Sequence, residues 1–449
     1  MRSAAEVREG LEAAYRERTP CSAALHHAAL QFIPGGVTRS VTHYAPYPVG
    51  VASGRGYRVT DVDGNEYIDH LNNFGSMILG HAHSAVVTAI RERVAKGIDF
   101  GAPTELQLEH ARVMVGREPS VERIRFTSSG TESILYALRA ARAFTKKPKI
   151  LKMEGSYHGG YDSVTVSVDP GASAPAWPEG KLGSRGLSRE TGAHTLVAPF
   201  NDLVRTAAIV RANAAELAAV IIEPVTVRAM IAADPAFLQG MREVTRETSV
   251  LLILDQVVTL RLSTGGAQEL FGVTPDLTTF GKFIGGGSPV GAFGGRADIM
   301  AGFDPGDAEP LQHSGTFAGN GAALAAGLAT LELLTREEIT RLNALGDRLR
   351  AGIRVRLESA GIRAQVTGLG SLVGVHFIDH QVRDYRTTLT ANREAMRWLH
   401  LALLNPGIFA RSTGSFFLST AMHETEVEET VAAIGGALEE VKPLLTEAP

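Results

Sequence analysis

Residues 251–257, LLILDQV, decide the fold: they form a continuous apolar run that ends in an acid, Asp255. An uninterrupted apolar run of this length is typical of a buried strand in a parallel sheet. Asp255 then falls at the carboxyl end of the strand, the edge where open α/β sheets hold their ligands. A carboxylate there can pair with a protonated ring nitrogen or a metal ion. A surface cap is the alternative interpretation.

Further short apolar runs alternate with helical stretches along the middle of the chain, at 149–152, 194–198 and 217–222. This rhythm predicts an α/β fold with a mostly parallel sheet covered by helices on both faces. The pattern differs towards both ends of the chain. Residues 56–68 indicate two strands around an Asp63-Gly64 turn, and residues 366–377 indicate a strand pair between the predicted helices 332–357 and 424–445.

These changes of pattern predict a smaller α+β domain built from the two ends of the chain. We expect an N-terminal segment over 1–75, a large ligand-binding domain over 76–320 and a C-terminal small domain over 321–449. Residues 169–186 are rich in Gly, Ala, Ser and Pro and contain Trp177. They predict a loop that is either ordered by a partner chain or mobile over a site.

Composition excludes several classes of protein. The chain has 44 Lys and Arg against 48 Asp and Glu, and this charge balance argues against a protein that binds nucleic acid through a basic face. The single cysteine, Cys21, excludes a disulfide framework and a multi-thiolate metal site. The charged N-terminus does not resemble a secretory signal, and no apolar run is long enough to span a bilayer. We therefore expect a cytoplasmic enzyme with no membrane partner and no metal.

A second motif lies at residues 127–133, TSSGTES, between a predicted strand at 123–126 and a predicted helix at 134–144. A helix start offers free backbone N–H groups and the positive end of the helix dipole, and the hydroxyl groups add donors. The motif therefore predicts a phosphate-binding cup. The alternative is an ordinary helix cap with Glu132 nearby.

A third motif lies at residues 278–287, TTFGKFIGGG, in which Lys282 stands between apolar residues and glycines. Lysine is rarely buried without a function. Desolvation would lower the pKa of its amine and make it nucleophilic, as Schiff-base chemistry requires. The alternative is a surface lysine whose alkyl chain covers apolar groups.

Together the three motifs fit one cofactor, pyridoxal 5′-phosphate, because they offer a phosphate cup, an acid for the ring nitrogen and a lysine for the aldehyde. The chain resembles the class III aminotransferases of pyridoxal-phosphate fold type I, in the branch of glutamate-1-semialdehyde aminomutase and the β-phenylalanine-type transaminases. The resemblance covers nearly the whole chain and rests on residues 33–37, 79–81, 100–105, 129–132, 157–159, 222–225, 275–279, 281–282, 289–295 and 314–316.

The resemblance implies a role for individual residues. Lys282 resembles the Schiff-base lysine and Asp255 the partner of the ring N–H. The cofactor-binding residues implied are Ser129, Gly130 and Thr131 for the phosphate, Tyr157 stacked on the ring, His158 and Glu223 beside it, Val257, and Thr316 from the neighbouring subunit of a homodimer. The family usually has Asp-Glu-Val where this chain has Asp255-Gln256-Val257. Gln256 removes a charge near the ring, which indicates either a different substrate or a different partner for a nearby arginine, with Arg261 as the candidate.

The substrates implied are a small-molecule amine and a keto acid, and the arginines bear on which amine. The β-amino-acid transaminases carry their substrate arginine at the position of Arg39, whereas the aminomutase carries its own at Thr42. We therefore predict a pyridoxal-phosphate-dependent aminotransferase for a carboxylate-bearing amine, with β-amino acids as a candidate class. The β-amino-acid transaminases also use an arginine in the C-terminal domain, at the position where this chain has Thr413. Arg411 lies two residues away, and it and Phe74 are the other substrate-contact candidates.

Several alternatives stay open. Residues 100–105 look more like the aminomutase, which would return the amine within one molecule. The alternative role for Arg39 is to form a salt bridge that links domains. His81 and His83 are expected to be structural rather than metal ligands. A non-catalytic regulator is disfavoured because Lys282 and Asp255 are both present, and a nicotinamide oxidoreductase because no Gly-x-Gly-x-x-Gly pattern occurs.

Overall fold

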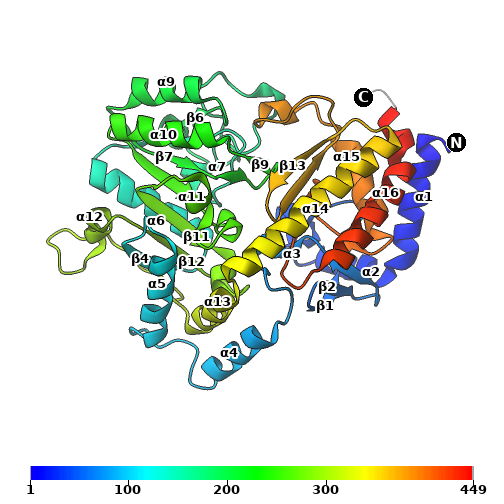
Figure 1. The fold of residues 1–449 in the computed structure, drawn as a ribbon, viewed down its shortest axis with the longest axis horizontal. Coiled ribbons are helices and arrows are strands. Elements are labelled where there is room, and N and C mark those ends of the chain that lie inside the picture. The colour runs from blue at the N-terminus through cyan, green and yellow to red at the C-terminus, as the bar shows by residue number, and fades with distance from the viewer. Residues whose placement is uncertain (1, 447–449) are drawn as a thin grey trace. The chain divides into compact units, whose positions relative to one another are not determined.

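The computed structural model describes residues 2–446, which divide into two compact units (Figure 1). The first unit consists of the chain up to His83, Leu342–Gln381 and the chain from Thr390 onward. The second unit consists of Ser84–Arg341 and the short strip Val382–Leu389. The predicted domain ranges divide the chain at other positions and stay a prediction. Each unit is described by itself.

A seven-stranded sheet forms the centre of the second unit, and it confirms the predicted mostly parallel α/β fold. The strand order is β4-β12-β11-β10-β7-β5-β6, and only β12 runs antiparallel to its neighbours. The strands are β4 (Arg123–Thr127), β5 (Lys149–Met153), β6 (Thr195–Ala198), β7 (Leu217–Ile222), β10 (Leu251–Asp255), β11 (Leu277–Gly281) and β12 (Gly291–Gly295). A separate two-stranded sheet pairs β8 (Val225–Thr226) with β9 (Ile231–Ala232).

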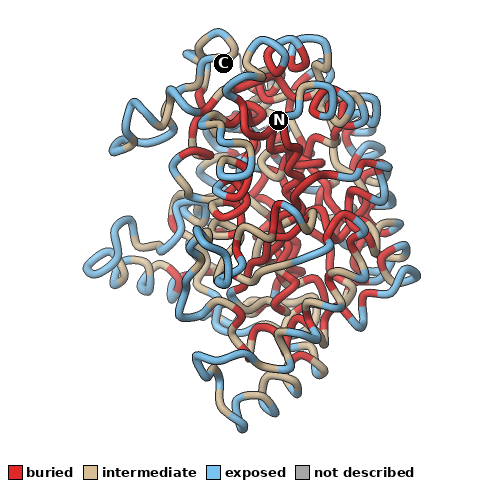
Figure 2. Tube along the Cα trace, turned by 90° about the vertical axis from the view of Figure 1, so that its left-hand side faces the viewer, coloured by how far each residue is buried: buried red, intermediate tan, exposed pale blue. Residues whose placement is uncertain are grey.

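Helices pack against this sheet and bury its apolar side chains. The core includes Ile134 and Leu138 of α6 with Ile253, Leu277 and Phe293 of the strands, each at most 1% exposed. Figure 2 shows the buried residues concentrated in the interior of the chain trace, with exposed residues along its outer segments. The helices of this unit are α4 (Ser84–Val94), α5 (Glu105–Arg117), α6 (Gly130–Thr145), α7 (Asp162–Thr165), α8 (Arg189–Ala193), α9 (Leu203–Asn213), α10 (Pro235–Glu247), α11 (Gly266–Phe271), α12 (Ala297–Met300) and α13 (Gly321–Leu333).

The first unit contains two smaller sheets and the long terminal helices. One sheet has the order β1-β2-β3-β15 and the other β13-β14-β16. The elements are α1 (Ala4–Arg18), α2 (Pro20–Ala29), β1 (Val51–Arg55), β2 (Arg58–Asp61), β3 (Glu66–Asp69), α3 (Asn72–Gly75), β13 (Gln365–Leu369), β14 (Leu372–His376), α15 (Arg393–Leu404), β15 (Ile408–Phe409), β16 (Ser415–Phe417) and α16 (Glu424–Thr446). Helix α14 (Arg336–Ala360) begins in the second unit and continues into the first.

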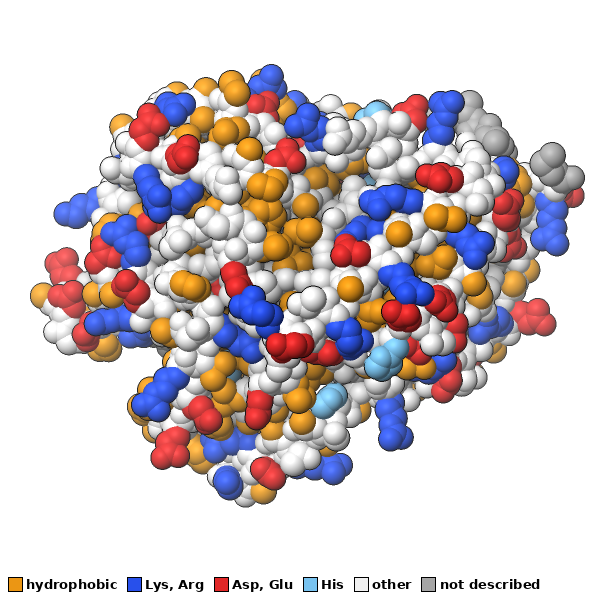
Figure 3. All heavy atoms as spheres, in the orientation of Figure 1, with side chains coloured by type: hydrophobic (Ala, Val, Ile, Leu, Met, Phe, Trp, Pro, Cys, Tyr) orange, Lys and Arg blue, Asp and Glu red, His pale blue; other side chains and the backbone are white. Residues whose placement is uncertain are grey.

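The local predictions for this unit agree with the structure. Strands β2 and β3 pair antiparallel around Asp63-Gly64, and β13 pairs with β14 around Gly370. Residues 4–29 form two helices rather than one continuous helix, because Pro20 stands at the first position of α2 and the chain turns at Thr19. None of the described helices is long and apolar enough to cross a membrane. Figure 3 shows acidic and basic side chains interspersed on the visible face.

Candidate active site

The carboxyl end of β10 presents Asp255 to a buried histidine. Asp255 is 5% exposed, and its Oδ2 lies 2.8 Å from Nδ1 of His158. Its Oδ1 accepts hydrogen bonds from Val257 N at 3.1 Å and from Thr279 Oγ1 at 3.3 Å. Burial lowers the pKa of His158 and outweighs the carboxylate beside it. The neutral ring therefore donates its Nδ1 proton to Asp255 and fixes the orientation of the carboxylate.

Glu223, which follows β7, holds the turn that carries Tyr157. Its two carboxyl oxygens accept from Tyr157 N at 2.9 Å and from Val227 N at 3.2 Å. Burial, and secondarily the charge of Asp255, raises the pKa of Glu223 to about 8. Tyr157 as a residue is 47% exposed. The arrangement fixes the main chain of Tyr157 and leaves its ring open to a planar ligand.

The Ser129-Gly130-Thr131 motif starts helix α6, as predicted. Ser129 Oγ accepts from the main-chain N of Glu132 at 3.2 Å, so this hydroxyl also caps the helix. Thr131 Oγ1 accepts from Gly160 N at 3.2 Å, which joins the cup to the turn after Tyr157. A Cβ atom on Gly130 would lie 3.2 Å from the Val257 side chain. The motif and Val257 are thus in close contact, and the free N–H groups of a long helix open there.

Lys282 lies at the end of β11 in a backbone conformation that is rare outside glycine, with φ +57°. Gly281 before it is extended, and a Cβ atom there would lie 3.4 Å from Gly130 Cα. A hydrogen bond from His110 stabilises the turn after Lys282: its Nε2 lies 2.7 Å from the carbonyl oxygen of Ile284. Burial lowers the pKa of His110 to about 4. A non-glycine residue at positive φ is backbone strain that the surrounding contacts must hold in place.

Thr316 lies in the segment just before α13. Ser314, Gly315, Thr316 and Phe317 are exposed, and Phe317 is 65% exposed. Together with Gly101, Ala102 and Arg125 they line an open cavity of about 890 Å³ in the second unit.

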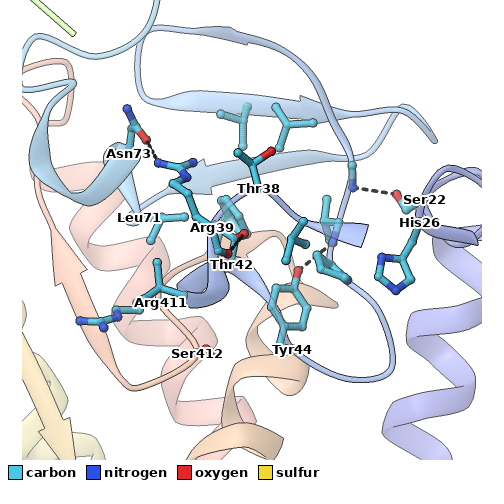
Figure 4. Close-up of a pocket in the computed structure, with 18 of the residues that line it drawn as sticks. Ser22, His26, Thr38, Arg39, Thr42, Tyr44, Leu71, Asn73, Arg411 and Ser412 are labelled. Atoms are coloured by element: carbon cyan, nitrogen blue, oxygen red, sulfur yellow. Dashed lines mark hydrogen bonds between the residues drawn. The ribbon is translucent and has the colours of Figure 1, made fainter. Parts of the chain in front are cut away.

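The substrate-contact candidates lie together in the first unit. The guanidinium carbons of Arg39 and Arg411 lie 5.3 and 6.0 Å from the centre of the Phe74 ring. Arg39 donates to Asn73 Oδ1 at 2.9 Å, a neutral amide rather than a carboxylate. Figure 4 shows both arginines on the wall of a cavity of about 440 Å³.

The turn that presents these groups is strained. Asn72, Asn73 and Phe74 have φ values of +52°, +42° and +57° in succession. Three consecutive non-glycine residues in the left-handed region are costly, and asparagine tolerates this region better than most residues. In this conformation Asn73 contacts Arg39, and the Phe74 ring lies within about 6 Å of both guanidinium groups.

Sequence reasoning missed two buried groups near this site. Lys152 of β5 is fully buried and donates to the carbonyl oxygens of Val166 at 2.9 Å and Met153 at 3.1 Å. Burial lowers the pKa of Lys152 to about 7. Glu118, also fully buried, accepts a hydrogen bond from Gln256 Nε2 at 2.7 Å. The structure thus shows what the Asp-Gln-Val sequence left open: Gln256 is engaged by Glu118.

The loop 169–186 is held by the strip Val382–Leu389 of the same chain. Tyr385 Oη donates to Asp169 at 2.5 Å, and Arg386 forms two bonds to the Glu154 carboxylate at 2.7 and 3.0 Å. Arg386 also lies 3.8 Å from the centre of the Trp177 ring. Sequence analysis predicted that this loop is either ordered by a partner chain or mobile over a site. The structure shows a third arrangement, in which contacts within the same chain hold the loop.

Among residues 2–446 no group of three His, Cys, Asp or Glu side chains is placed to hold a metal ion. His81 instead lies 2.7 Å from Asp69 through its Nε2 atom.

Comparison with known proteins follows this geometry. A family model described as aminotransferase class-III matches residues 40–434. Glutamate-1-semialdehyde 2,1-aminomutase of Methanosarcina acetivorans is 40% identical over 91% of this chain and 96% of its own length. An omega-transaminase from Sphaerobacter thermophilus is 40% identical, with a TM-score of 0.92 over 95% of this chain and 99% of that one. A β-phenylalanine aminotransferase from Variovorax paradoxus is 34% identical, with a TM-score of 0.88 over 96% and 97%.

Proposed function

Because this chain belongs to the class-III aminotransferase family, whose enzymes use pyridoxal 5′-phosphate, we propose that it moves an amino group between a carboxylate-bearing amine and a keto acid through Lys282. The observation that carries this proposal is the pairing of Asp255 with a buried neutral His158 at the same sheet edge as the left-handed Lys282 turn. A carboxylate oriented in this way suits a protonated ring nitrogen.

The donor set fits the cofactor. The start of α6 offers free N–H groups for a phosphate, beside Val257. The half-exposed Tyr157 offers a ring face, and Glu223 fixes its main chain. When bound, the cofactor supplies an electron-accepting ring.

The protein side of the reaction follows from these groups. Asp255 holds the proton on the ring nitrogen, and the bond from His158 keeps its carboxylate in place. The Lys282 amine binds the cofactor and, once released, moves a proton at the substrate carbon as general base and acid. Ser129, Gly130 and Thr131 bind and orient the phosphate.

For the substrate we propose that Arg39 and Arg411 bind carboxylate groups beside Phe74. Arginine offers a planar fork of donors for a carboxylate, and Arg39 is held by a neutral partner that leaves its positive charge uncompensated. This set favours an amino acid as amine donor, with β-amino acids as the candidate class. Intramolecular transfer on glutamate 1-semialdehyde is the second candidate, supported by the 40% identity to an aminomutase.

We further propose a cytoplasmic homodimer with shared active sites. Two exposed residues support this assignment. Phe317 is 65% exposed, and burying its large apolar side chain in a subunit interface would be favourable. Thr316 beside it is also exposed and would then be placed to reach the phosphate of the neighbouring subunit. Its test is the mass of the protein in solution and the cofactor affinity of Thr316→Ala.

The experiment that tests the function begins with borohydride reduction of the cofactor-loaded protein. The label should fix on the peptide that contains Lys282, and a label on another lysine would refute the assignment. A screen with α-, β- and γ-amino acids, simple amines and glutamate 1-semialdehyde then separates the two candidates, because only the aminomutase reaction needs no second substrate.

Arg39→Ala should lower kcat/KM for acidic donors by at least about tenfold, since a charge-assisted bond contributes about 1.5–3 kcal/mol. Simple amines should lose much less. Arg39→Lys should restore only part, because a point charge does not reproduce the fork. Equal losses for all donors, together with a lower thermal midpoint, would indicate a structural role for Arg39.

A further inference from the structure

A buried acid–amide cluster lies directly behind Asp255. Gln256, the next residue, is fully buried, and its Nε2 donates to Glu118 Oε2 at 2.7 Å. Gln268 donates its side-chain amide to the same oxygen, and its main-chain N donates to Gln256 Oε1 at 3.2 Å. Both the donor and the acceptor of the Gln256 side chain are therefore occupied.

Three elements bring these groups together. Glu118 follows α5, Gln256 follows β10, and Gln268 lies in α11. Gly266 at the start of α11 has φ +64°, and a Cβ atom there would lie 2.3 Å from Gln256 Oε1. A side chain at position 266 would therefore clash as well as strain the backbone. The cluster leaves one place for the Gln256 side chain.

We propose that Glu118 is a positioning residue for Asp255, acting through Gln256. The turn Asp255-Gln256-Val257 is fixed on one side by β11, where Gln256 N donates to the carbonyl oxygen of Thr279 at 3.0 Å. It is fixed on the other side by the bond from Gln256 to Glu118. The role as positioner of the ring-nitrogen partner rests on the proposed function, whereas the coupling between Glu118 and Gln256 does not.

The coupling acts by hydrogen-bond satisfaction. Without the Glu118 oxygen, the buried Gln256 amide loses its acceptor, and an unpaired buried donor is costly enough to move the turn. Asp255 Oδ1 accepts from Val257 N within that turn at 3.1 Å. A shift of the turn therefore reorients the Asp255 carboxylate against His158.

The charge state of Glu118 gives this arrangement a pH signature. Burial raises the pKa of Glu118 well above its usual range, the charge of Glu269 acts in the same direction, and the Gln256 donor and Arg117 oppose them. Because the folded-state pKa is raised, the stabilising contribution is full below the unfolded value and is lost as pH rises towards the folded value. Each pH unit in that window lowers the folding equilibrium constant about tenfold relative to a variant without the acid.

The test exchanges the acid and the amide. Glu118→Leu, Gln256→Glu and the exchange Glu118→Gln/Gln256→Glu are compared with wild type, and Glu309→Gln serves as an exposed matched control. Two measurements are made on each: the thermal midpoint of the cofactor-free protein against pH, and the pH midpoint of the cofactor's absorbance band with its dissociation constant. The second would not move if Glu118 were merely structural.

We expect Gln256→Glu to bind pyridoxal phosphate at least about tenfold more weakly, because two carboxyl groups then share one buried site. Glu118→Leu should shift the pH midpoint of the band, and the exchange should recover most of the affinity by restoring one acid and one amide. An exchange variant no better than the sum of its single changes would overturn the coupling. An unshifted band in Glu118→Leu would overturn the positioning role. The cofactor-free midpoints stand even if Lys282 proves not to bind the cofactor, so the two failures are distinguishable.

Discussion

Replacing Arg386 by methionine should destabilise the second unit and release the loop 169–186. Glu154 is 3% exposed, and its carboxylate receives two bonds from Arg386 at 2.7 and 3.0 Å. Arg386 also donates to the carbonyl oxygen of Pro175 at 2.7 Å and covers the Trp177 ring at 3.8 Å. Methionine keeps an unbranched apolar side chain about as long as the alkyl stem of arginine and removes all of these polar contacts.

The magnitude follows from the exposure of the two partners. Breaking a buried pair costs about 3–5 kcal/mol because it leaves a buried charge unpaired. The Arg386 side chain is 32% exposed, so solvent already screens part of the interaction. We therefore expect a loss of about 2–3 kcal/mol from the ion pair and about 0.5–1 kcal/mol from the contact with Trp177. Together these contributions make about 2.5–4 kcal/mol, and at about 2–4 °C per kcal/mol the thermal midpoint should fall by roughly 5–16 °C.

The assay combines thermal unfolding with trypsin digestion. Arg185 in the loop is exposed, and its cleavage should accelerate in Arg386→Met. Arg383→Met is the matched control, because Arg383 lies in the same strip with a 56% exposed side chain and a single ion pair to Asp234 at 3.6 Å. The double variant Glu154→Gln/Arg386→Met should recover most of the lost stability, since the amide of Gln leaves no unpaired charge buried at position 154. A double variant as unstable as Arg386→Met, or a single variant that loses less than about 1 kcal/mol, would refute the reasoning.

Three further changes test the site itself. Asp255→Asn should retain the fold and lose activity by orders of magnitude, because an amide does not hold the ring proton; near wild-type turnover would exclude that role. His158→Phe should lower kcat more than it raises KM, since the Asp255 oxygen loses its buried donor 2.8 Å away, and an unchanged kcat would argue against the orienting bond. His110→Leu leaves the Ile284 carbonyl oxygen without the donor now 2.7 Å away, so borohydride trapping on Lys282 should slow while simple heat stability falls by about 1–3 kcal/mol; an unaltered trapping rate would show that the turn holds itself.

Local sequence patterns predicted five of the seven strands of the large sheet (β4, β5, β6, β7 and β10) and the three motifs, because each depends on residues adjacent in the chain. Strands β11 and β12 were not predicted. The LLILDQV run is a buried strand with Asp255 at its end, and the TSSGTES motif starts a helix. The environment of Gln256 could not be predicted, because Glu118 lies 138 residues away in sequence. The contact between Arg386 and Glu154 spans 232 residues and joins two segments that carry no shared pattern.

The left-handed turn at Asn72–Phe74 is a different case, since a local signal existed. Two asparagines followed at a distance of two residues by Gly75 favour positive φ, but a phenylalanine at φ +57° runs against every propensity. The Phe74 ring lies near the guanidinium groups of Arg39 and Arg411, which are distant in sequence and which no local pattern indicates. Charge states could not be predicted from the sequence either. The lowered pKa of Lys152 depends on complete burial, and Lys152 lies in a strand whose sequence contains polar residues.

The strip Val382–Leu389 has a consequence for how this protein can be divided or recombined. The chain changes units at 83/84, 341/342, 381/382 and 389/390, so neither unit is encoded by one continuous stretch. A fragment that stops at Arg341 would contain Glu154 and Asp169 without Arg386 and Tyr385, the residues that neutralise and bond them. A hybrid that exchanges the large unit with that of a relative must therefore carry eight residues from a distant part of the gene, or inherit a buried carboxylate with no partner.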